Sequence, residues 1–549
     1  MGLAVTGVAA QGLRTLCDEV VAPLFDFLHG EPLLSGDLCG RDFTLQQAQD
    51  DGGFAFGRPA LDVGRFFRHS TIYALGSIVN RAGAFLLLPL YTSRLSTGEY
   101  GTLELYYVIA SVVSGLLSVG IAHATLRFYF DYPEQRERNT LVTTNLIASL
   151  LISGCGAGLL LLIAEPLSSL VLGVPGPRWA MPVVLATLVL ELSSQVSLAY
   201  LRARELSVFF VVLSVVKLLI QCIANVIALT QFNAGVVGIL FGNFLAVALG
   251  WLILTCYTIS KCGLRFEMAK VSPVLRYSLP FLYITVLALF SANLDRLLIN
   301  SLISIEAVGL YALAQKFAKL IADLIGEPFN RAYGSFRFTI MDQSDAATIQ
   351  ARIFRYAAVA LAIVTMGVAY FAVDVIRIMA ASSYLPASTL VPPLALAAGL
   401  GVLTYVTQTG VLYAKKSDAL FRITLIRTVV VAVLAYPAIA GFELAGICAL
   451  ALLDAVLGLV LTHRMSQRYF AVQYDLRRLG LLGLLAMVFY GASLPAAMLT
   501  DSVAIVVKVA LICLFLLAIH STGVLTAPER KWIRERWRRL RPAADRIET

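Results

Sequence analysis

The residues best suited to bind an anion lie close together in one apolar stretch of the chain, residues 308–327. Lys316, Lys319 and Asp323 follow one another at spacings of three and four residues, which places them on one stripe of a helix. One interpretation is a cationic patch in an aqueous cavity that holds an anionic ligand. The alternative is a Lys319 to Asp323 ion pair that neutralises itself between helices. Because Asp323 can neutralise only one lysine, the pattern favours the cationic patch.

Four more cations interrupt apolar stretches, namely Arg81, Lys217, Arg427 and Lys508. A charged side chain inside a bilayer costs about 2.5 kcal/mol or more, so each is expected to be shielded, paired or functional. Arg81 has no carboxylate at helical spacing in its own stretch, which predicts that it lines a cavity and binds substrate; a pair with Glu104 or Glu191 is the alternative. Lys217 and Arg427 are further substrate-binding candidates, although the long stem of either could instead extend its charge to the membrane surface.

A second set of candidates could bind a driving ion or act as a gate. Asp295 and Arg296 end one apolar stretch near its outer side, where they form either an outer gate or coupling-ion site, or a local interfacial ion pair. Glu191 shares a helix face with Gln195, so its carboxylate is a candidate site for a driving proton or sodium ion. Asp323 belongs to this set as well.

These side chains must be positioned by membrane-spanning helices. Every second segment between the apolar stretches is rich in Lys and Arg, and the intervening segments are poor in them. Cationic side chains are retained on the cytoplasmic side, so the alternation predicts both the number of crossings and their direction. With roughly 20 apolar residues needed per crossing, we predict an all-α polytopic membrane protein with about fourteen transmembrane helices and both termini in the cytoplasm. The predicted spans are 71–93, 101–125, 140–163, 179–200, 209–230, 235–258, 277–295, 308–327, 356–376, 389–414, 423–440, 444–463, 479–499 and 502–522.

Composition excludes several other classes of protein. Apolar residues make up 59% of the chain and charged residues 14%, which is too little charge for a soluble surface. The net charge of +9 is accounted for by membrane orientation and by anionic lipids of the inner leaflet, so we expect no nucleic-acid partner. The eight cysteines include no Cys-x-x-Cys pair and have no histidine at ligand spacing, which predicts neither a disulfide nor a metal site. No cofactor is expected.

The spans contain an internal repeat. A shift of 208 residues superimposes span 101–125 on span 308–327 with nine identities over 38 positions, among them Gly101 on Gly309. An even number of intervening spans gives both copies the same orientation, so the repeat is parallel, about an axis along the membrane normal. This predicts two six-helix lobes and two further helices. The predicted domains are 1–65 (a disordered cytoplasmic leader, or a start codon assigned too far upstream), 66–258 (N-terminal lobe), 259–276 (cytoplasmic linker), 277–463 (C-terminal lobe), 464–525 (helices 13 and 14) and 526–549 (a basic amphipathic cytoplasmic tail).

Three stretches resemble a known family. Tyr91 to Gly101 (YTSRLSTGEYG), Leu126 to Asp131 (LRFYFD) and above all Asn293 to Ala318 (NLDRLLINSLISIEAVGLYALAQKFA) resemble the polysaccharide-exporter branch of the multidrug, oligosaccharidyl-lipid and polysaccharide exporter superfamily. That branch includes the bacterial O-antigen and capsule repeat-unit flippases. The resemblance covers roughly residues 66–525, and the leader departs from the pattern. It implies a MATE-like fold of two six-helix lobes and the transfer of polyprenyl-pyrophosphate-linked glycans across the inner membrane by alternating access.

Two other functions are alternatives. A membrane glycan polymerase or ligase would need a long outer loop with catalytic residues, but the predicted outer connections are short, about 2 to 15 residues, so we do not expect an enzyme. A drug or small-solute exporter of the same superfamily is a closer alternative, although cationic drugs would call for acidic and aromatic lining rather than lysines. The expected partners are a lipid-linked glycan, anionic inner-leaflet lipids at the amphipathic tail, and polysaccharide assembly proteins.

Overall fold

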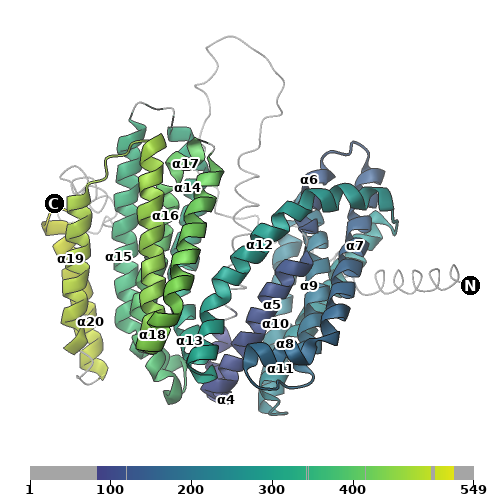
Figure 1. Ribbon diagram of the computed structural model, residues 1–549, viewed down its shortest axis with the longest axis horizontal. Coiled ribbons are helices and arrows are strands. Elements are labelled where there is room, and N and C mark those ends of the chain that lie inside the picture. The colour runs from purple at the N-terminus through teal and green to yellow at the C-terminus, as the bar shows by residue number, and fades with distance from the viewer. Residues whose placement is uncertain are drawn as a thin grey trace, which may run out of the picture. The chain divides into compact units, whose positions relative to one another are not determined.

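The computed structural model describes residues 83, 85–118, 120–341, 343, 345–414, 416–495 and 501–524 (Figure 1). The predicted leader, the predicted tail and Arg81 lie outside the described residues. Every regular element in these ranges is a helix and none is a strand, which confirms the all-α prediction. The helices are divided between two compact units.

The first unit includes residues 109–169 and 175–290. Within it, α9 packs against α6, α7 and α11, and α10 packs against α11. Buried apolar side chains such as Tyr200, Phe209 and Leu254 form a core cluster. The helices wholly in this unit are α6 (Ile121–Tyr129), α7 (Gln135–Leu162), α9 (Ala180–Ala203), α10 (Ser207–Thr230) and α11 (Gly235–Cys262). It shares α5 (Thr97–Ser118), α8 (Ala164–Leu172) and α12 (Met268–Leu302) with the second unit.

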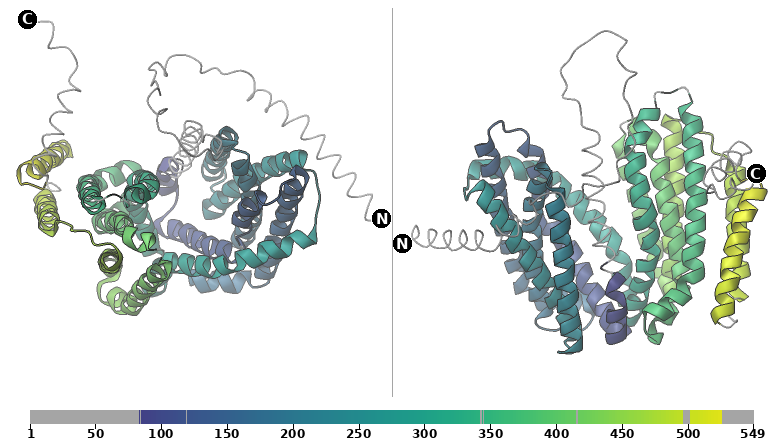
Figure 2. Two further views of the ribbon diagram at one scale, coloured as in Figure 1. Left: turned by 90° about the horizontal axis from the view of Figure 1, so that it is seen from above. Right: turned by 180° about the vertical axis from the view of Figure 1, so that it is seen from behind.

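The second unit includes residues 88–108, 170–174 and the described chain from 291 onward. Here α16 packs against α13, α15 and α18, while α19 and α20 pack against each other and against α15, as the yellow pair in Figure 2 shows. Its helices are α4 (Leu88–Arg94), α13 (Ile305–Ile321), η2 (Ala322–Gly326), α14 (Glu327–Ile340), α15 (Ala346–Met379), η3 (Ser382–Thr389), α16 (Val391–Thr407), α17 (Thr409–Tyr413), α18 (Ser417–Tyr469), α19 (Leu476–Ser493) and α20 (Asp501–Ser521).

Within the described ranges, ten helices are long and apolar enough to cross a membrane. One of them, α18, contains two predicted spans, 423–440 and 444–463, and the spans predicted at 277–295 and 308–327 lie in α12 and in α13 with η2. The first predicted span, 71–93, lies mostly outside the described residues. The number fourteen, like the domain boundaries, therefore stays a prediction.

Two predicted spans are interrupted in ways that the apolar pattern did not show. Span 101–125 is broken because Gly120 adopts a left-handed conformation (φ 69°), so α5 ends at Ser118 and α6 begins at Ile121. Span 308–327 changes from an α-helix to the π-helical turn η2 at Ala322. Both breaks are local changes of the backbone inside an uninterrupted apolar run, which hydropathy does not detect. The kink of α18 at Glu443 (φ 48°), by contrast, lies in the connection predicted between spans 423–440 and 444–463.

Candidate functional site

Two helices that the repeat relates, α5 and α13, begin at equivalent serine caps. At α5 the backbone N–H and the hydroxyl of Ser96 donate to the Glu99 carboxylate (2.9 and 3.0 Å), and the Ser96 hydroxyl accepts from the Glu99 N–H (3.2 Å). This is a capping box. At α13 the hydroxyl of Ser304, 208 residues later, accepts from the Ala307 N–H at 3.2 Å. The repeated serine thus fixes the start of both helices.

The same helices meet at the repeat-related glycines. A Cβ on Gly101 would lie 2.0 Å from the carbonyl oxygen of Ile305, and a Cβ on Gly309 would lie 2.2 Å from that of Thr97. Thr97 and Ile305 are themselves related by the shift of 208 residues. The backbones therefore approach too closely for a side chain at either position, and the contact has the symmetry of the repeat.

A buried aromatic residue holds the start of α5 in place. The Tyr384 hydroxyl, from η3, donates to the carbonyl oxygens of Leu95 (3.1 Å) and Ser96 (3.0 Å). Burial, together with the nearby Glu99 carboxylate, raises the pKa of Tyr384, so the phenol keeps its proton at neutral pH and remains a donor. Its ring packs edge-on against Tyr100, with centroids 5.9 Å apart. This contact positions the first turn of α5, on which the site depends.

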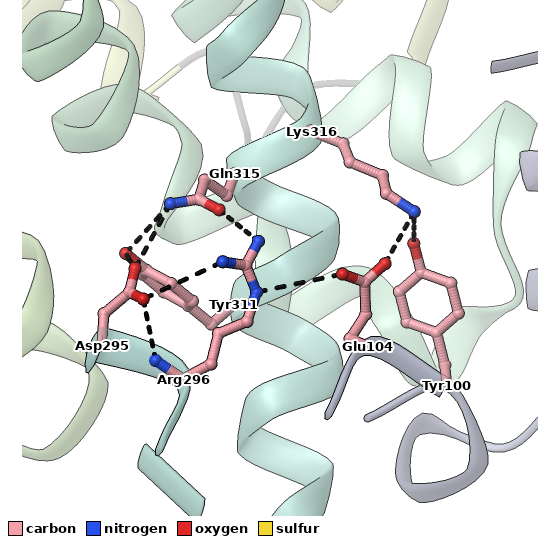
Figure 3. Close-up of polar contacts among 7 residues, drawn as sticks. All are labelled: Tyr100, Glu104, Asp295, Arg296, Tyr311, Gln315 and Lys316. Carbon is pink, nitrogen blue, oxygen red and sulfur yellow. Dashed lines mark hydrogen bonds and ion pairs between the residues drawn. The ribbon is translucent and has the colours of Figure 1, made fainter. Parts of the chain in front are cut away.

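Beyond the glycine contact, one turn along α5 and two turns along α13, the two helices are joined by an ion pair (Figure 3). The Lys316 ammonium lies 2.8 Å from Oε1 of Glu104 and donates to the Tyr100 hydroxyl at 2.6 Å. The Glu104 side chain is only 6% exposed, whereas that of Lys316 is 29% exposed. Glu104 is thus a buried carboxylate whose lysine partner still reaches accessible space.

The second half of the cluster comes from α12 and α13. Nε of Arg296 lies 3.9 Å from Oε2 of Glu104, and a terminal nitrogen of Arg296 donates to the Gln315 side-chain oxygen at 2.5 Å. Asp295 accepts from the Tyr311 hydroxyl (2.6 Å) and from the Gln315 amide (3.3 Å). Figure 3 shows these side chains converging from both sides of α13. We call the seven residues the α13 cluster: Tyr100, Glu104, Asp295, Arg296, Tyr311, Gln315 and Lys316.

The structure brings together three of the predicted site residues, Lys316, Asp295 and Arg296, in the α13 cluster. The charges of its two carboxylates and two cations sum to zero. Lys319, one turn further along α13, is exposed, and in the ranges that the structure describes it has no hydrogen bond or ion pair. Asp323 lies half-buried in η2, and π-helical turns are frequent at functional sites. The Lys319 to Asp323 ion pair considered from the sequence is therefore not formed.

The remaining candidates lie elsewhere. In the first unit, Lys217 stands near the middle of α10 with its stem against Gly250, and within the described ranges neither it nor the exposed Glu191 has a hydrogen bond or ion pair. In the second unit, Arg427 donates to the Asp454 carboxylate at 2.9 and 2.5 Å. This contact joins the two halves of α18, which lie before and after Glu443. Arg427 therefore has a carboxylate partner inside the membrane, and whether it also meets substrate stays a prediction.

Most of the partners in the cluster were not predicted from the sequence. Glu104 was named only as an alternative partner for Arg81, and Tyr100 and Tyr311 were not singled out. The available signal was that Glu104 is a carboxylate four residues after a tyrosine inside an apolar stretch. A second buried ion pair, Lys508 to Asp374 at 2.5 Å, was also missed. Among the described residues no group of three His, Cys, Asp or Glu side chains could hold a metal ion.

Solved structures resemble this chain in fold. The lipid II flippase MurJ, in an inward closed conformation, aligns with a TM-score of 0.64 at 10% identity over 84% of this chain and 100% of its own. An inward-facing multidrug resistance MATE family transporter of the MOP superfamily aligns at 0.53 with 16% identity, over 72% and 98% of the two chains. A mutant of the MATE transporter VcmN from Vibrio cholerae aligns at 0.52 with 16% identity, over 74% and 97%. At these identities the likeness shows the fold alone, a MATE-like transporter fold.

Sequence comparison gives the family. A protein of the Lsg locus of Haemophilus influenzae is 29% identical over 96 residues, which is 17% of this chain, and the match spans only about a quarter (24%) of that relative's length. The family model described as polysaccharide biosynthesis protein matches residues 93–389, more than half of the chain and all of the α13 cluster. The resemblance noted in the sequence is thereby confirmed: this multi-pass membrane protein belongs to the polysaccharide biosynthesis protein family.

Proposed function

We propose that the protein flips or exports a lipid-linked glycan, a polyprenyl-pyrophosphate-linked oligosaccharide or polysaccharide repeat unit, across the bacterial inner membrane. The family and the transporter fold support transport in polysaccharide biosynthesis rather than an enzymatic reaction. Transfer proceeds by alternating access of two lobes, with both termini in the cytoplasm. The anionic head enters a polar site while the lipid tail remains in the bilayer.

The observation that best supports an anionic substrate is the exposure of the two lysines on α13. In the described ranges Lys319 is exposed and makes no hydrogen bond or ion pair, although the carboxylates of Asp295, Glu104 and Asp323 act on it from a longer distance. Lys316 is partly exposed beside it. An unpaired ammonium inside a membrane protein is costly unless it faces water or a ligand. We assign these two lysines, together with Arg81, to the pyrophosphate or to acidic sugars; Lys217 is a further contact, and Arg427 is the weakest candidate because Asp454 holds it.

The acidic candidates have a separate proposed role. Asp295 and Arg296 act as a gate or coupling-ion site, and Asp323 and Glu191 are additional candidates for the coupling ion. The dense hydrogen bonding of Asp295 to Tyr311 and Gln315 supports a gating role, because it links α12 to α13 through side chains that can exchange partners.

The test is the fate of the glycan in cells. Deletion of the gene is expected to abolish an exported polysaccharide and to accumulate its lipid-linked precursor inside the cell. Lys316→Ala and Lys319→Ala should each lower surface glycan about tenfold, since a hydrogen bond to a charged group contributes about 1.5–3 kcal/mol. Arg422→Ala, which removes an exposed cation at the start of α18, is the matched control and should export normally.

Two results would contradict the proposal. Normal surface polysaccharide in the deletion strain would exclude the glycan as substrate, and drug sensitivity in the same strain would favour the small-solute exporter. Normal export by both lysine variants, at normal protein levels, would remove the assigned site.

A further inference from the structure

Glu104 is shared by two cations, and we infer that Arg296 is a stand-by counter-ion that allows Lys316 to leave Glu104 and bind the pyrophosphate of the substrate. The inference rests on the proposed function, because it assumes that Lys316 meets an anionic head group. It assigns Arg296 as a positioning residue that acts on the substrate through Glu104.

The burial of Glu104 makes such a counter-ion necessary. Its side chain is 6% exposed, with Lys316 at 2.8 Å from one oxygen and Arg296 at 3.9 Å from the other. Removing one partner of a buried ion pair is strongly destabilising because the remaining charge is left uncompensated. If Lys316 were its only cation, Glu104 would hold that lysine and oppose substrate binding. With Arg296 already beside the second oxygen, the carboxylate stays compensated when Lys316 departs.

The two cations differ in a way that fits this division of roles. Arg296 is only 9% exposed and is fixed by Gln315, which accepts from it at 2.5 Å. Lys316 is 29% exposed and ends in a compact ammonium on a flexible stem. Lys316 can therefore turn toward a ligand while Arg296 remains in place.

Asp295 does not compete strongly for Arg296. Its carboxylate accepts from the Tyr311 hydroxyl (2.6 Å), the Gln315 amide (3.3 Å) and the backbone N–H of Arg296 (2.8 Å). The guanidinium lies 3.9 Å from the nearest oxygen of Asp295 and 3.9 Å from that of Glu104, so the two carboxylates differ in their other donors and not in their distance from Arg296. Three hydrogen-bond donors already satisfy Asp295, so the guanidinium of Arg296 is free to compensate Glu104.

The test measures binding of undecaprenyl pyrophosphate to the purified full-length protein in phosphatidylcholine nanodiscs. Arg296→Gln should weaken binding about tenfold or more, a loss typical of one charge-assisted interaction, because Glu104 then retains Lys316. Adding Glu104→Gln to that variant should recover most of the affinity, since no buried carboxylate is left to compensate. Adding Asp295→Asn instead restores the same net charge but leaves Glu104 without Arg296, and should recover none. Arg422→Gln is the matched control and should bind normally.

The pattern of rescue decides the inference. Recovery with Glu104→Gln alone supports it, provided that all variants elute as one species and unfold at similar temperatures. Equal recovery with Asp295→Asn would show that only net charge matters, and recovery with neither would show that Arg296 acts by another route; either result overturns the inference. Lys316→Ala separates the two proposals. If this variant does not bind and Glu104→Gln fails to rescue Arg296→Gln, the stand-by role of Arg296 is wrong but Lys316 remains a substrate-binding residue. If Lys316→Ala binds normally, Lys316 is not part of the binding site.

Discussion

At the scale of single residues, three cations of the second unit pair with carboxylates that lie far outside their own helical turn. Lys316 pairs with Glu104, Arg427 with Asp454, and Lys508 with Asp374. The last pair joins α20 to α15 and is the most enclosed of these three, with side chains 8% and 14% exposed. Its burial makes it the pair whose disruption should cost most in stability.

Asp374→Asn is expected to destabilise the protein by about 3–5 kcal/mol, because it leaves the Lys508 ammonium buried and uncompensated. The measurement is the unfolding temperature of the purified protein in detergent. Lys508→Met in the same chain should restore much of the loss, since an apolar side chain needs no counter-ion. Asp418→Asn breaks an exposed pair with Arg422 and should change little. A variant at 374 as stable as the one at 418 would contradict the buried pair.

At the scale of elements, the contact between α5 and α13 depends on two glycines whose positions the repeat relates. Gly101→Ala and Gly309→Ala should each destabilise the protein by about 1–3 kcal/mol or more, because a Cβ would overlap a backbone carbonyl that cannot rotate away. Both should also lower export, since the contact sets the distance between Glu104 and Lys316. The unfolding temperature and surface glycan report the two effects.

Gly154→Ala is the matched control for these substitutions. Gly154 also lies in a membrane-length helix, α7, but a Cβ there would meet nothing within 4 Å. Alanine favours a helix over glycine by about 1 kcal/mol, so this variant should be as stable as the parent or more so. Equal losses at 154 and 101 would mean that close approach of the backbones is not the cause.

The same two helices show what could and could not be predicted from sequence. The apolar runs predicted the positions of most helices, and the shift of 208 residues related Gly101 to Gly309 and Ser96 to Ser304 before their contacts were known. The partner of Lys316 was not predictable, because Glu104 lies 212 residues away and helical spacing relates only residues of one helix. Sequence spacing paired Asp323 with Lys319 and left Lys316 without a partner, whereas in the structure Lys316 pairs with Glu104.

At the scale of the whole molecule, the remaining prediction is orientation in the membrane. The Lys and Arg alternation places the N-terminal end of α15 in the cytoplasm and its C-terminal end outside. α15 contains 34 residues, so at 1.5 Å per residue it is about 50 Å long and its ends extend beyond a hydrocarbon core of about 30 Å. Thr348, near its start, and Ser383, just beyond its end, are both exposed.

Cysteines at these two positions should therefore react from opposite sides. In intact spheroplasts a membrane-impermeant maleimide is expected to label Ser383→Cys and to label Thr348→Cys only after the membrane is permeabilised, with the unsubstituted chain as the background. Both are small substitutions at exposed positions, so neither should alter export. The reverse pattern would invert the orientation, and with it the side from which the proposed substrate would reach Lys316 and Lys319. Labelling of both in intact spheroplasts would contradict α15 as a membrane-spanning helix.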